Sequence, residues 1–240
     1  MLRRLTAEAL GSLLLAATVV GSGIMAARLA GGNVAIALLA NTAATVAMLA
    51  TLIALLGPLS GAHFNPAVTL VMALRHRMGW WMAGAYVVVQ VLGCCAGSVL
   101  AHAMFSLPLL QAATHVRAGA AQWLAEFVAT AGLILVVLGH ERPRDAPWMI
   151  AAWIGAAYWF TASTSFANPA ITVARALSNT FAGIRPQDVP AFILAQLAGA
   201  VAASFLASCL FVVRGHAVSE PPADIRASLP GDDPLGGAEK

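Results

Sequence analysis

The tripeptide Asn65-Pro66-Ala67 occurs a second time as Asn168-Pro169-Ala170, and each copy interrupts an apolar stretch of the chain. Asn is a good N-cap and Pro fits the first helical position, so each tripeptide predicts the start of a helix. Inside a membrane, non-helical backbone is tolerated only where it is buried in protein or lines a cavity. Two such helix starts, one in each half of the chain, predict a pore or binding site at the membrane midplane.

The composition is that of an integral membrane protein. Of the 240 residues, 60% are hydrophobic and 10% are charged, whereas soluble domains have about 25% charged residues. The net charge of +3 is small and gives no indication of a nucleic-acid partner. The three cysteines (Cys94, Cys95 and Cys209) lie in apolar stretches without a CxxC or histidine pattern, so we interpret them as free thiols. The sequence predicts one membrane domain with no cofactor and no metal.

Six apolar segments are long enough to cross a bilayer, and two shorter ones come directly after the Asn residues of the tripeptides. The long segments are about 6–27, 34–56, 80–104, 121–139, 147–163 and 190–213, and the short ones are about 66–74 and 169–177. Nine residues of helix rise about 13 Å, roughly half of a 30 Å hydrocarbon core. Two half-helices that meet end to end would therefore complete one further span.

The chain repeats internally. A Glu-x-x-x-Ser/Thr motif begins at Glu8 and again at Glu126, and a Gln-x-x-Gly motif begins at Gln90 and again at Gln196. Each repeat contains three spans, an odd number, so the second repeat must be inserted upside down relative to the first. We expect one channel-like domain over 1–213, with repeat one at about 5–105 and repeat two at about 121–213.

The distribution of Lys and Arg predicts the orientation. Nine fall on one side of the six-span arrangement: Arg3, Arg4, Arg75, Arg77, Arg142, Arg144, Arg214, Arg226 and Lys240. Four fall on the other side: Arg28, Arg117, Arg175 and Arg185. Because positive residues concentrate in cytoplasmic segments, both termini are expected in the cytoplasm. The segment 214–240, rich in Pro, Gly and Asp, is expected to be a disordered cytoplasmic tail.

These motifs also carry a family resemblance. One stretch is similar to the first signature loop of the aquaporin, or major intrinsic protein, family: Ser60-Gly61-Ala62-His63-Phe64-Asn65-Pro66-Ala67-Val68-Thr69-Leu70. The second tripeptide and both repeated motifs match as well, over about 5–213. The resemblance implies an all-α membrane protein with an aquaporin-like fold: six transmembrane helices plus two half-helices from an inverted three-helix repeat, usually in a homotetramer. It implies a passive channel and not an enzyme, and no nucleophile–base pair appears in the spans.

The resemblance also implies roles for the motif residues. The amides of Asn65 and Asn168 are expected to line the pore, since an amide that caps a helix has donors to spare. Backbone carbonyls before each tripeptide are expected to face the pore: Gly61, Ala62, His63 and Phe64 in the first loop, and Thr164, Ser165, Phe166 and Ala167 in the second. The side chain of His63 either contacts the solute or packs beside its loop. Pro66, Ala67, Pro169 and Ala170 complete the pore motif.

Two further expectations concern charge. Glu8 and Glu126 are the only acids within the spans. The resemblance implies that they accept hydrogen bonds from the two loops, and a proton relay is the alternative. Each half-helix start carries roughly half a positive charge, which repels a cation by about 2 kcal/mol at about 4 Å and an effective dielectric of about 20. The pore is therefore expected to reject cations and pass neutral molecules.

The sequence departs from the family at the selectivity filter. Most members have Arg directly after the second tripeptide, and here that residue is Ile171. The family's spacing puts the other filter positions at Thr45, Ala156 and Ser165, with a shift of one turn left open for the span-five residue. Small side chains without the arginine predict a wide filter for small polyols, urea-like molecules or neutral metalloid acids such as arsenous or boric acid. The alternatives are an ordinary water or glycerol channel and a closed-pore structural membrane protein.

Arg175 lies one helical turn after Ile171, on the same face. It either guards the outer mouth or extends to the membrane interface. The stretch from Thr164 to Ile184 is similar to a bacterial subgroup of the family whose genes often neighbour arsenic-resistance genes. That similarity implies metalloid or organoarsenical permeation in a bacterial inner membrane, with small neutral solutes, water and the lipid bilayer as partners.

Overall fold

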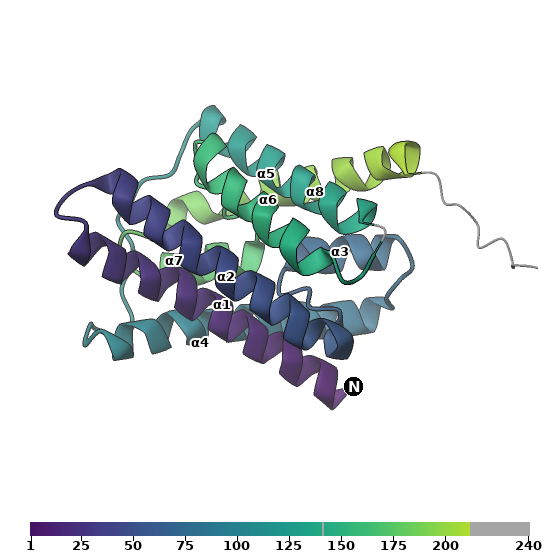
Figure 1. Ribbon diagram of the computed structural model, residues 1–240, viewed down its shortest axis with the longest axis horizontal. Helices are drawn as coiled ribbons and strands as arrows, with labels where there is room; N and C mark the ends of the chain where they lie inside the picture. Colours follow the sequence, from purple (N-terminus) through teal and green to yellow (C-terminus); the bar gives the residue numbers. More distant parts are fainter. Residues whose placement is uncertain (141, 212–240) are drawn as a thin grey trace, which may run out of the picture.

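A computed structural model describes residues 1–140 and 142–211, and every regular secondary-structure element within them is a helix (Figure 1). The elements are α1 (Leu2–Leu29), α2 (Val34–Ser60), α3 (Pro66–Leu74), α4 (Trp80–Met104), α5 (Ala120–Gly139), α6 (Ala146–Phe160), α7 (Pro169–Ala176), the 3-10 turn η1 (Pro186–Asp188) and α8 (Val189–Leu210). The predicted all-α class is confirmed. The predicted tail 214–240 lies outside the described residues.

Five of these helices have the length and composition to cross a membrane: α1, α2, α4, α5, and α8 together with η1. The expected span at 147–163 is shorter than predicted, because α6 has 15 residues and ends at Phe160. Thr161 already has extended backbone angles. Its hydroxyl donates to the carbonyl of Ala157, which closes the last turn of α6. The residues Thr161, Ala162 and Ser163, which the prediction included in the span, therefore belong to a loop.

The two tripeptides start half-helices, as the sequence predicts. Asn65 and Asn168 are the N-caps of α3 and α7, and Pro occupies the first helical position in both. The two half-helices have nine and eight residues and extend toward opposite ends of the bundle (Figure 1). This is the arrangement of an inverted repeat in which two short helices replace one span.

The longer helices pack in equivalent pairs. α1 packs mainly against α4 and α2, and α5 packs mainly against α8 and α6. Where the Gln-x-x-Gly motifs cross their partners, the backbones are very close. A Cβ on Gly93 would lie 2.5 Å from the carbonyl oxygen of Ala9, and one on Gly199 would lie 2.4 Å from that of Phe127. Small residues at these crossings let the helices of each pair pack closely, which holds α1 against α4 and α5 against α8.

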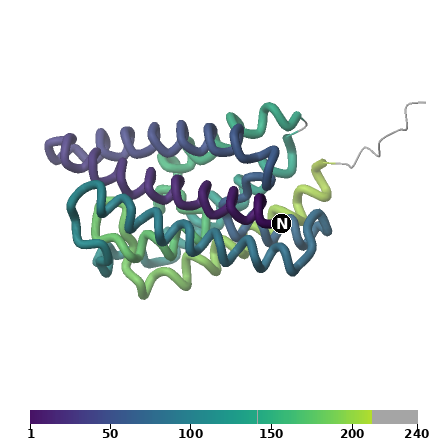
Figure 2. Tube along the Cα trace, turned by 90° about the horizontal axis from the view of Figure 1, so that it is seen from below, coloured from purple at the N-terminus to yellow at the C-terminus, as the bar shows by residue number. Residues whose placement is uncertain are grey.

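The surface is apolar, with large hydrophobic side chains exposed on the outer faces of the helices. Trp80, Trp81 and Trp148 are exposed at the first turns of α4 and α6, where aromatic residues of membrane proteins meet the headgroups. The N-terminus and the last turn of α8 lie at the same end of the bundle (Figure 2). We call this the inner end, and the opposite end, where α4 leads into α5, the outer end.

Candidate functional site

A cavity of about 690 Å³ extends along the centre of the bundle. Its lining reaches from His140 and Arg144 at the inner end to Arg175 toward the outer end, and it includes Asn65 and Asn168 between them. Most of the wall is apolar, with a few polar groups, as is usual for small-molecule sites. Among the described residues that line it, none is Asp or Glu.

The two motif asparagines connect the halves of the molecule at the middle of this cavity. Each side-chain oxygen accepts a hydrogen bond from the backbone N–H two residues further on, which caps its half-helix. Nδ2 of Asn65 donates to the carbonyl of Ala167 at 2.7 Å, and Nδ2 of Asn168 donates to the carbonyl of Phe64 at 2.8 Å. Each amide nitrogen carries two N–H groups, so one remains for a solute. These hydrogen bonds between the two halves were not predicted from the sequence.

The loops before the half-helices have matching, non-helical backbones. Ala62 and Phe64 have φ of 48° and 47°, and Ser165 and Ala167, at the same distances before their asparagine, also have 48° and 47°. Positive φ is uncommon for residues other than Gly, so the surrounding structure must hold these loops in place. Gly61, Ala62, His63 and Phe64 all line the cavity, as do Ser165, Phe166 and Ala167. Thr164 does not, so that expectation was wrong by one residue.

Glu8 holds the first loop. It is fully buried and accepts hydrogen bonds from the backbone N–H groups of His63 and Phe64, at 3.0 and 2.7 Å. The hydroxyl of Ser60 and the amide of Gln90 donate to the same carboxylate, at 2.7 and 2.8 Å. Four donors thus compensate one buried carboxylate, which is what a charge out of reach of water requires.

Glu126 holds the second loop in the same way. It is also fully buried and accepts from the N–H groups of Phe166 and Ala167, both at 2.9 Å, and from Gln196 at 2.6 Å. The second hydrogen bond of each glutamine goes to a half-helix hydroxyl, Thr69 in α3 and Thr172 in α7. Carboxylate, glutamine and threonine therefore form one support unit in each half.

On α6, Tyr158 lines the cavity, whereas Ala156, the residue expected at the filter, does not. Ala156 is exposed on the outside of the bundle and does not line the cavity, whereas Ile154 and Tyr158 do. Two residues along a helix differ by roughly 200° in direction, so an error of two positions moves a side chain from pore to lipid. The hydroxyl of Tyr158 lies 3.5 Å from that of Thr45. The phenol of Tyr158 thus lies where the sequence predicted the methyl group of Ala156. The larger side chain narrows the cavity on the side of α6.

The remaining predicted filter residues line the cavity. Thr45, Ser165 and Ile171 are buried and belong to its wall. The hydroxyl of Ser165 is buried and has no hydrogen-bond partner within the described residues. His63 is half-buried; its ring lines the cavity while its Nδ1 lies 3.0 Å from the hydroxyl of Thr69. The two interpretations of His63, solute contact and packing beside the loop, are therefore compatible.

Arg175 is buried in the wall of the cavity and does not extend to the membrane interface. Only 3% of it is exposed. Its Nε donates to the carbonyl of Ala182, and its guanidinium lies over the ring of Phe166, 3.4 Å from the centroid. A cation fixed in this way stands one helical turn beyond Ile171, toward the outer end.

A second buried arginine, Arg117, was not singled out from the sequence. It belongs to the connection between α4 and α5, donates to the carbonyls of Gly183 and Ser163, and lies 4.9 Å from the centroid of Phe166. Burial lowers the pKa of Arg117 to about 10, so it stays charged at neutral pH. Nothing in its local sequence marks it, because only the folding of the connection back onto the bundle brings it here.

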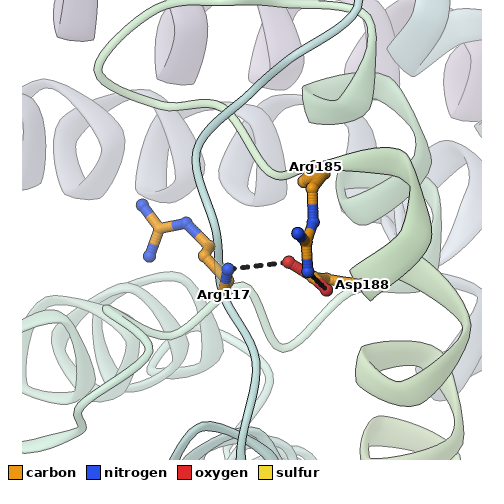
Figure 3. Close-up of polar contacts among 3 residues, drawn as sticks. All are labelled: Arg117, Arg185 and Asp188. Atoms are coloured by element: carbon orange, nitrogen blue, oxygen red, sulfur yellow. Dashed lines mark hydrogen bonds and ion pairs between the residues drawn. The ribbon is translucent and has the colours of Figure 1, made fainter.

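Asp188 anchors this connection (Figure 3). Its carboxylate accepts from the backbone N–H of Arg117 at 2.8 Å and from the guanidinium of Arg185 at 2.8 Å. This contact therefore joins two segments far apart in the sequence, the α4–α5 connection and the segment between α7 and α8. Their charged groups are linked to one another and to backbone carbonyls.

The described residues hold no group of three or more His, Cys, Asp or Glu side chains that could bind a metal. The cysteines there are unpaired: Cys94 is buried, Cys95 is partly buried and Cys209 is exposed. The chemistry of the cavity is therefore that of hydrogen bonding, shape and fixed charge.

Comparisons with known proteins agree with this geometry. The family model described as major intrinsic protein matches residues 1–160. The chain is 57% identical over 154 residues to aquaglyceroporin AqpS of Rhizobium meliloti, which covers 63% of this chain and 66% of that protein. It is 30% identical over 165 residues to aquaporin NIP1-4 of Oryza sativa, covering 66% of this chain and 60% of that protein. The chain thus spans slightly less than two thirds of the length of these relatives.

Among solved structures, the fold is similar to that of the aquaglyceroporin from Plasmodium falciparum. The TM-score is 0.67, and the alignment covers 88% of this chain and 97% of that one. The sequences are 18% identical, so this likeness concerns the fold. It confirms the predicted arrangement of long helices around two half-helices.

Proposed function

Because the chain belongs to the major intrinsic protein family, we propose that it is a passive transmembrane channel for small uncharged solutes. One observation carries the proposal. Two half-helices begin at the middle of one central cavity, and the asparagines that cap them line it. A multi-pass membrane protein has no structural need for a polar break at this depth, whereas a solute path does. Membership of the family also argues against an enzyme.

Fixed charge supports rejection of cations. The N-termini of α3 and α7 both face the centre of the cavity, and each carries roughly half a positive charge. A cation at about 4 Å from both is repelled by about 4 kcal/mol at an effective dielectric of about 20, before any loss of hydration. No carboxylate among the described lining residues offsets this repulsion. Uncharged molecules are unaffected by it.

The filter supports a solute larger than water. Ile171 takes the place of the usual arginine, and Ser165 and Thr45 add hydroxyls to the wall of the same cavity. Such a two-faced wall suits small polyols and neutral metalloid acids of the arsenous acid type, which combine hydroxyl groups with a compact body. Similarity to a protein named aquaglyceroporin supports the polyols of this class.

Tyr158 favours a second candidate, an ordinary water or glycerol channel. Its phenol reduces the opening on the side of α6, where the sequence predicted only Ala156. A narrower filter shifts the balance from metalloid acids toward glycerol and water. For both candidates we infer a homotetramer in a bacterial inner membrane with both termini cytoplasmic.

Flux into liposomes distinguishes the candidates. Vesicles with the purified full-length protein are challenged osmotically with water, glycerol or arsenous acid, and light scattering follows their volume. We expect rapid entry of glycerol or arsenous acid. Flux of water alone would contradict the solute proposal, and flux that follows a proton gradient would contradict passivity.

A matched pair of variants ties the flux to the cavity. Ile171→Trp fills the filter, whereas Val88→Trp makes a similar change on an exposed position of α4. We expect the first variant to abolish solute entry and the second to retain it. The absence of flux from wild-type vesicles and from both variants would instead support the closed-pore structural role.

A further inference from the structure

The outer part of the cavity contains a buried cation with unused donors. The Nε of Arg175 donates to Ala182, and the ring of Phe166 covers one face of the guanidinium. Within the described residues, the two terminal nitrogens of Arg175 make no hydrogen bond, although the residue lines the cavity. Stacking on Phe166 blocks a face and leaves the edge of the guanidinium open. This edge is the part that binds two oxygens of one anion side by side.

A second unused donor lies on the same wall. Ser165 is 2% exposed, and its hydroxyl has no partner within the described residues. Most buried side-chain hydroxyls are hydrogen-bonded within their protein, so the hydroxyl of Ser165 in the cavity wall has hydrogen-bonding capacity to offer a solute. The hydroxyls of Tyr158 and Thr45 complete the polar side, and at 3.5 Å apart they bind one another weakly. We call Thr45, Tyr158, Ser165, Ile171 and Arg175 the outer site.

The charges around the outer site sum to a positive value. Three guanidinium groups (Arg117, Arg175 and Arg185) stand against two carboxylates, Glu126 and Asp188. Both carboxylates already accept hydrogen bonds, Glu126 from two backbone N–H groups and Gln196, and Asp188 from Arg117 and Arg185. Neither carboxylate is among the residues that line the cavity.

A neighbouring histidine reports the same positive field. Burial lowers the pKa of His115, and the charges of Arg117 and Arg175 lower it further. The N-terminus of α7, nearly two turns inward from Arg175, adds a partial positive charge of its own. An anion in the outer site would therefore be attracted from several directions.

We propose that the outer site binds small singly charged oxyanions, of which carboxylates are the simplest, through the guanidinium edge of Arg175 and the hydroxyl of Ser165. Ile171 supplies an apolar wall for the alkyl group of such a ligand. The inference rests on the proposed function in so far as the cavity is the solute path. It adds a ligand class that a channel for uncharged solutes does not include.

Acetate is the probe, because it pairs a carboxylate with one methyl group. Thermal unfolding of the full-length protein in detergent is followed at neutral pH while sodium acetate replaces sodium chloride at constant ionic strength. A ligand that binds only the folded protein raises the midpoint in a saturable way. We expect this rise in the wild type, together with saturable slowing of glycerol entry into liposomes by acetate.

The variants test the assigned residues. Arg175→Gln is expected to weaken the apparent acetate affinity at least about tenfold. Ser165→Ala is expected to weaken it by a smaller factor. Because it removes only one oxygen atom, Ser165→Ala serves as the test if Arg175→Gln does not fold. Arg28→Gln is the matched control, because Arg28 is at the same end and stacks on Phe105 but lies outside the cavity. It should respond to acetate as the wild type does.

The outcomes separate this inference from the channel proposal. Glycerol flux without any acetate response, or an equal response in wild type, Arg175→Gln and Ser165→Ala, would overturn the oxyanion site and leave the channel standing. An acetate response that Arg175→Gln abolishes, in a protein without solute flux, would support the site and overturn the channel.

Discussion

At the scale of single residues, the choice of solute depends on which side chains form the narrowest ring of the cavity. Ile171 and Tyr158 are two large side chains of the outer site, and they stand on different elements. One is apolar and the other has a hydroxyl close to Thr45. Replacing each in turn therefore changes either the charge or the width of the filter.

Ile171→Arg should restore the charge that most family members have and fill the opening. The new cation would lie one turn from Arg175, on the same face of α7. We expect glycerol entry into liposomes to fall about tenfold, equivalent to ~1.4 kcal/mol, while water permeation changes little. Ile171→Leu, which conserves volume, is the control. An equal loss of water and glycerol flux would show that Ile171 does not form the constriction.

Tyr158→Ala should widen the filter. The variant removes a phenol from the cavity wall, so larger polyols that the wild type excludes should enter. Ala156→Val changes the same helix on its exposed outer face and should leave the size limit unchanged. The measurement is the entry rate of polyols of increasing length. A size limit that responds to Ala156→Val but not to Tyr158→Ala would contradict the assignment.

Residues whose role depends on local chemistry could be predicted from the sequence. Asn65 and Asn168 are each followed directly by Pro and Ala, and this tripeptide has the residues typical of a helix start. The tripeptides alone therefore indicate both N-caps. Arg117 and Tyr158 could not be predicted in this way. Arg117 reaches the outer end only through the course of its loop, and the direction of Tyr158 depends on where α6 ends.

At the scale of elements, each half-helix depends on one support unit in which a buried glutamate and glutamine hold a strained loop. Glu8 and Gln90 serve the loop before α3, and Glu126 and Gln196 serve the loop before α7. The repeated motifs indicated this correspondence before the structure. The sequence did not show that the loops also exchange hydrogen bonds across the midplane, because that contact joins residues about one hundred positions apart, 102 in one case.

Glu126→Gln should loosen the second loop. A Gln side chain has one acceptor oxygen in place of two, so the N–H of Phe166 or Ala167 loses its partner. A buried donor without a partner costs about 1–3 kcal/mol, or about 2–4 °C in the unfolding midpoint for each kcal/mol in a chain of this size. Asp145→Asn, the same change at a partly exposed carboxylate, is the control. Unchanged stability of Glu126→Gln would mean that the loop is held by other contacts.

Two glycines of α4, one at its crossing with α1 and one away from it, should respond oppositely to replacement by Ala: the first change should lower the stability of the fold and the second should raise it. Gly97→Ala would place a Cβ 2.2 Å from the carbonyl of Leu13, so the helices must separate, at a cost of about 1–3 kcal/mol. Gly84→Ala on the same helix meets nothing within 4 Å and should gain about 0.5–1 kcal/mol from helix propensity. Thermal unfolding measures both. Equal effects would show that close packing at Gly97 is not required.

At the scale of the whole molecule, fixed positive charge is found at both ends of a cavity whose described lining has no acid. Arg77 and Arg144 line its inner end and Arg175 its outer part, with two helix N-termini between them. The sequence could predict the helix starts, because their capping residues are adjacent in the chain. It could not predict that one cavity connects them with these arginines, since that depends on how the helices pack.

The same charges predict how the molecule lies in the membrane. Among described residues, six arginines stand at the inner end: Arg3, Arg4, Arg75, Arg77, Arg142 and Arg144. Of the four at the outer end, Arg117 and Arg175 are buried at 8% and 3% exposure, which leaves Arg28 and Arg185 at the surface. Among the described residues the count is six to four with the buried arginines and six to two without them, and both counts favour an inner end in the cytoplasm.

Labelling of single cysteines in intact cells tests this orientation. With Cys95 and Cys209 replaced by Ala and Cys94 left buried, Ala118→Cys places a thiol on the outer connection, and Gly79→Cys places one at the inner end. Both positions are exposed, and a Cβ at Gly79 meets nothing within 4 Å, so neither change should disturb the fold. A membrane-impermeant maleimide should label 118 in intact cells and 79 only after lysis, because the positive end stays inside. The reverse pattern would contradict the predicted orientation, because the arginine count favours the inner end even when the buried arginines are included.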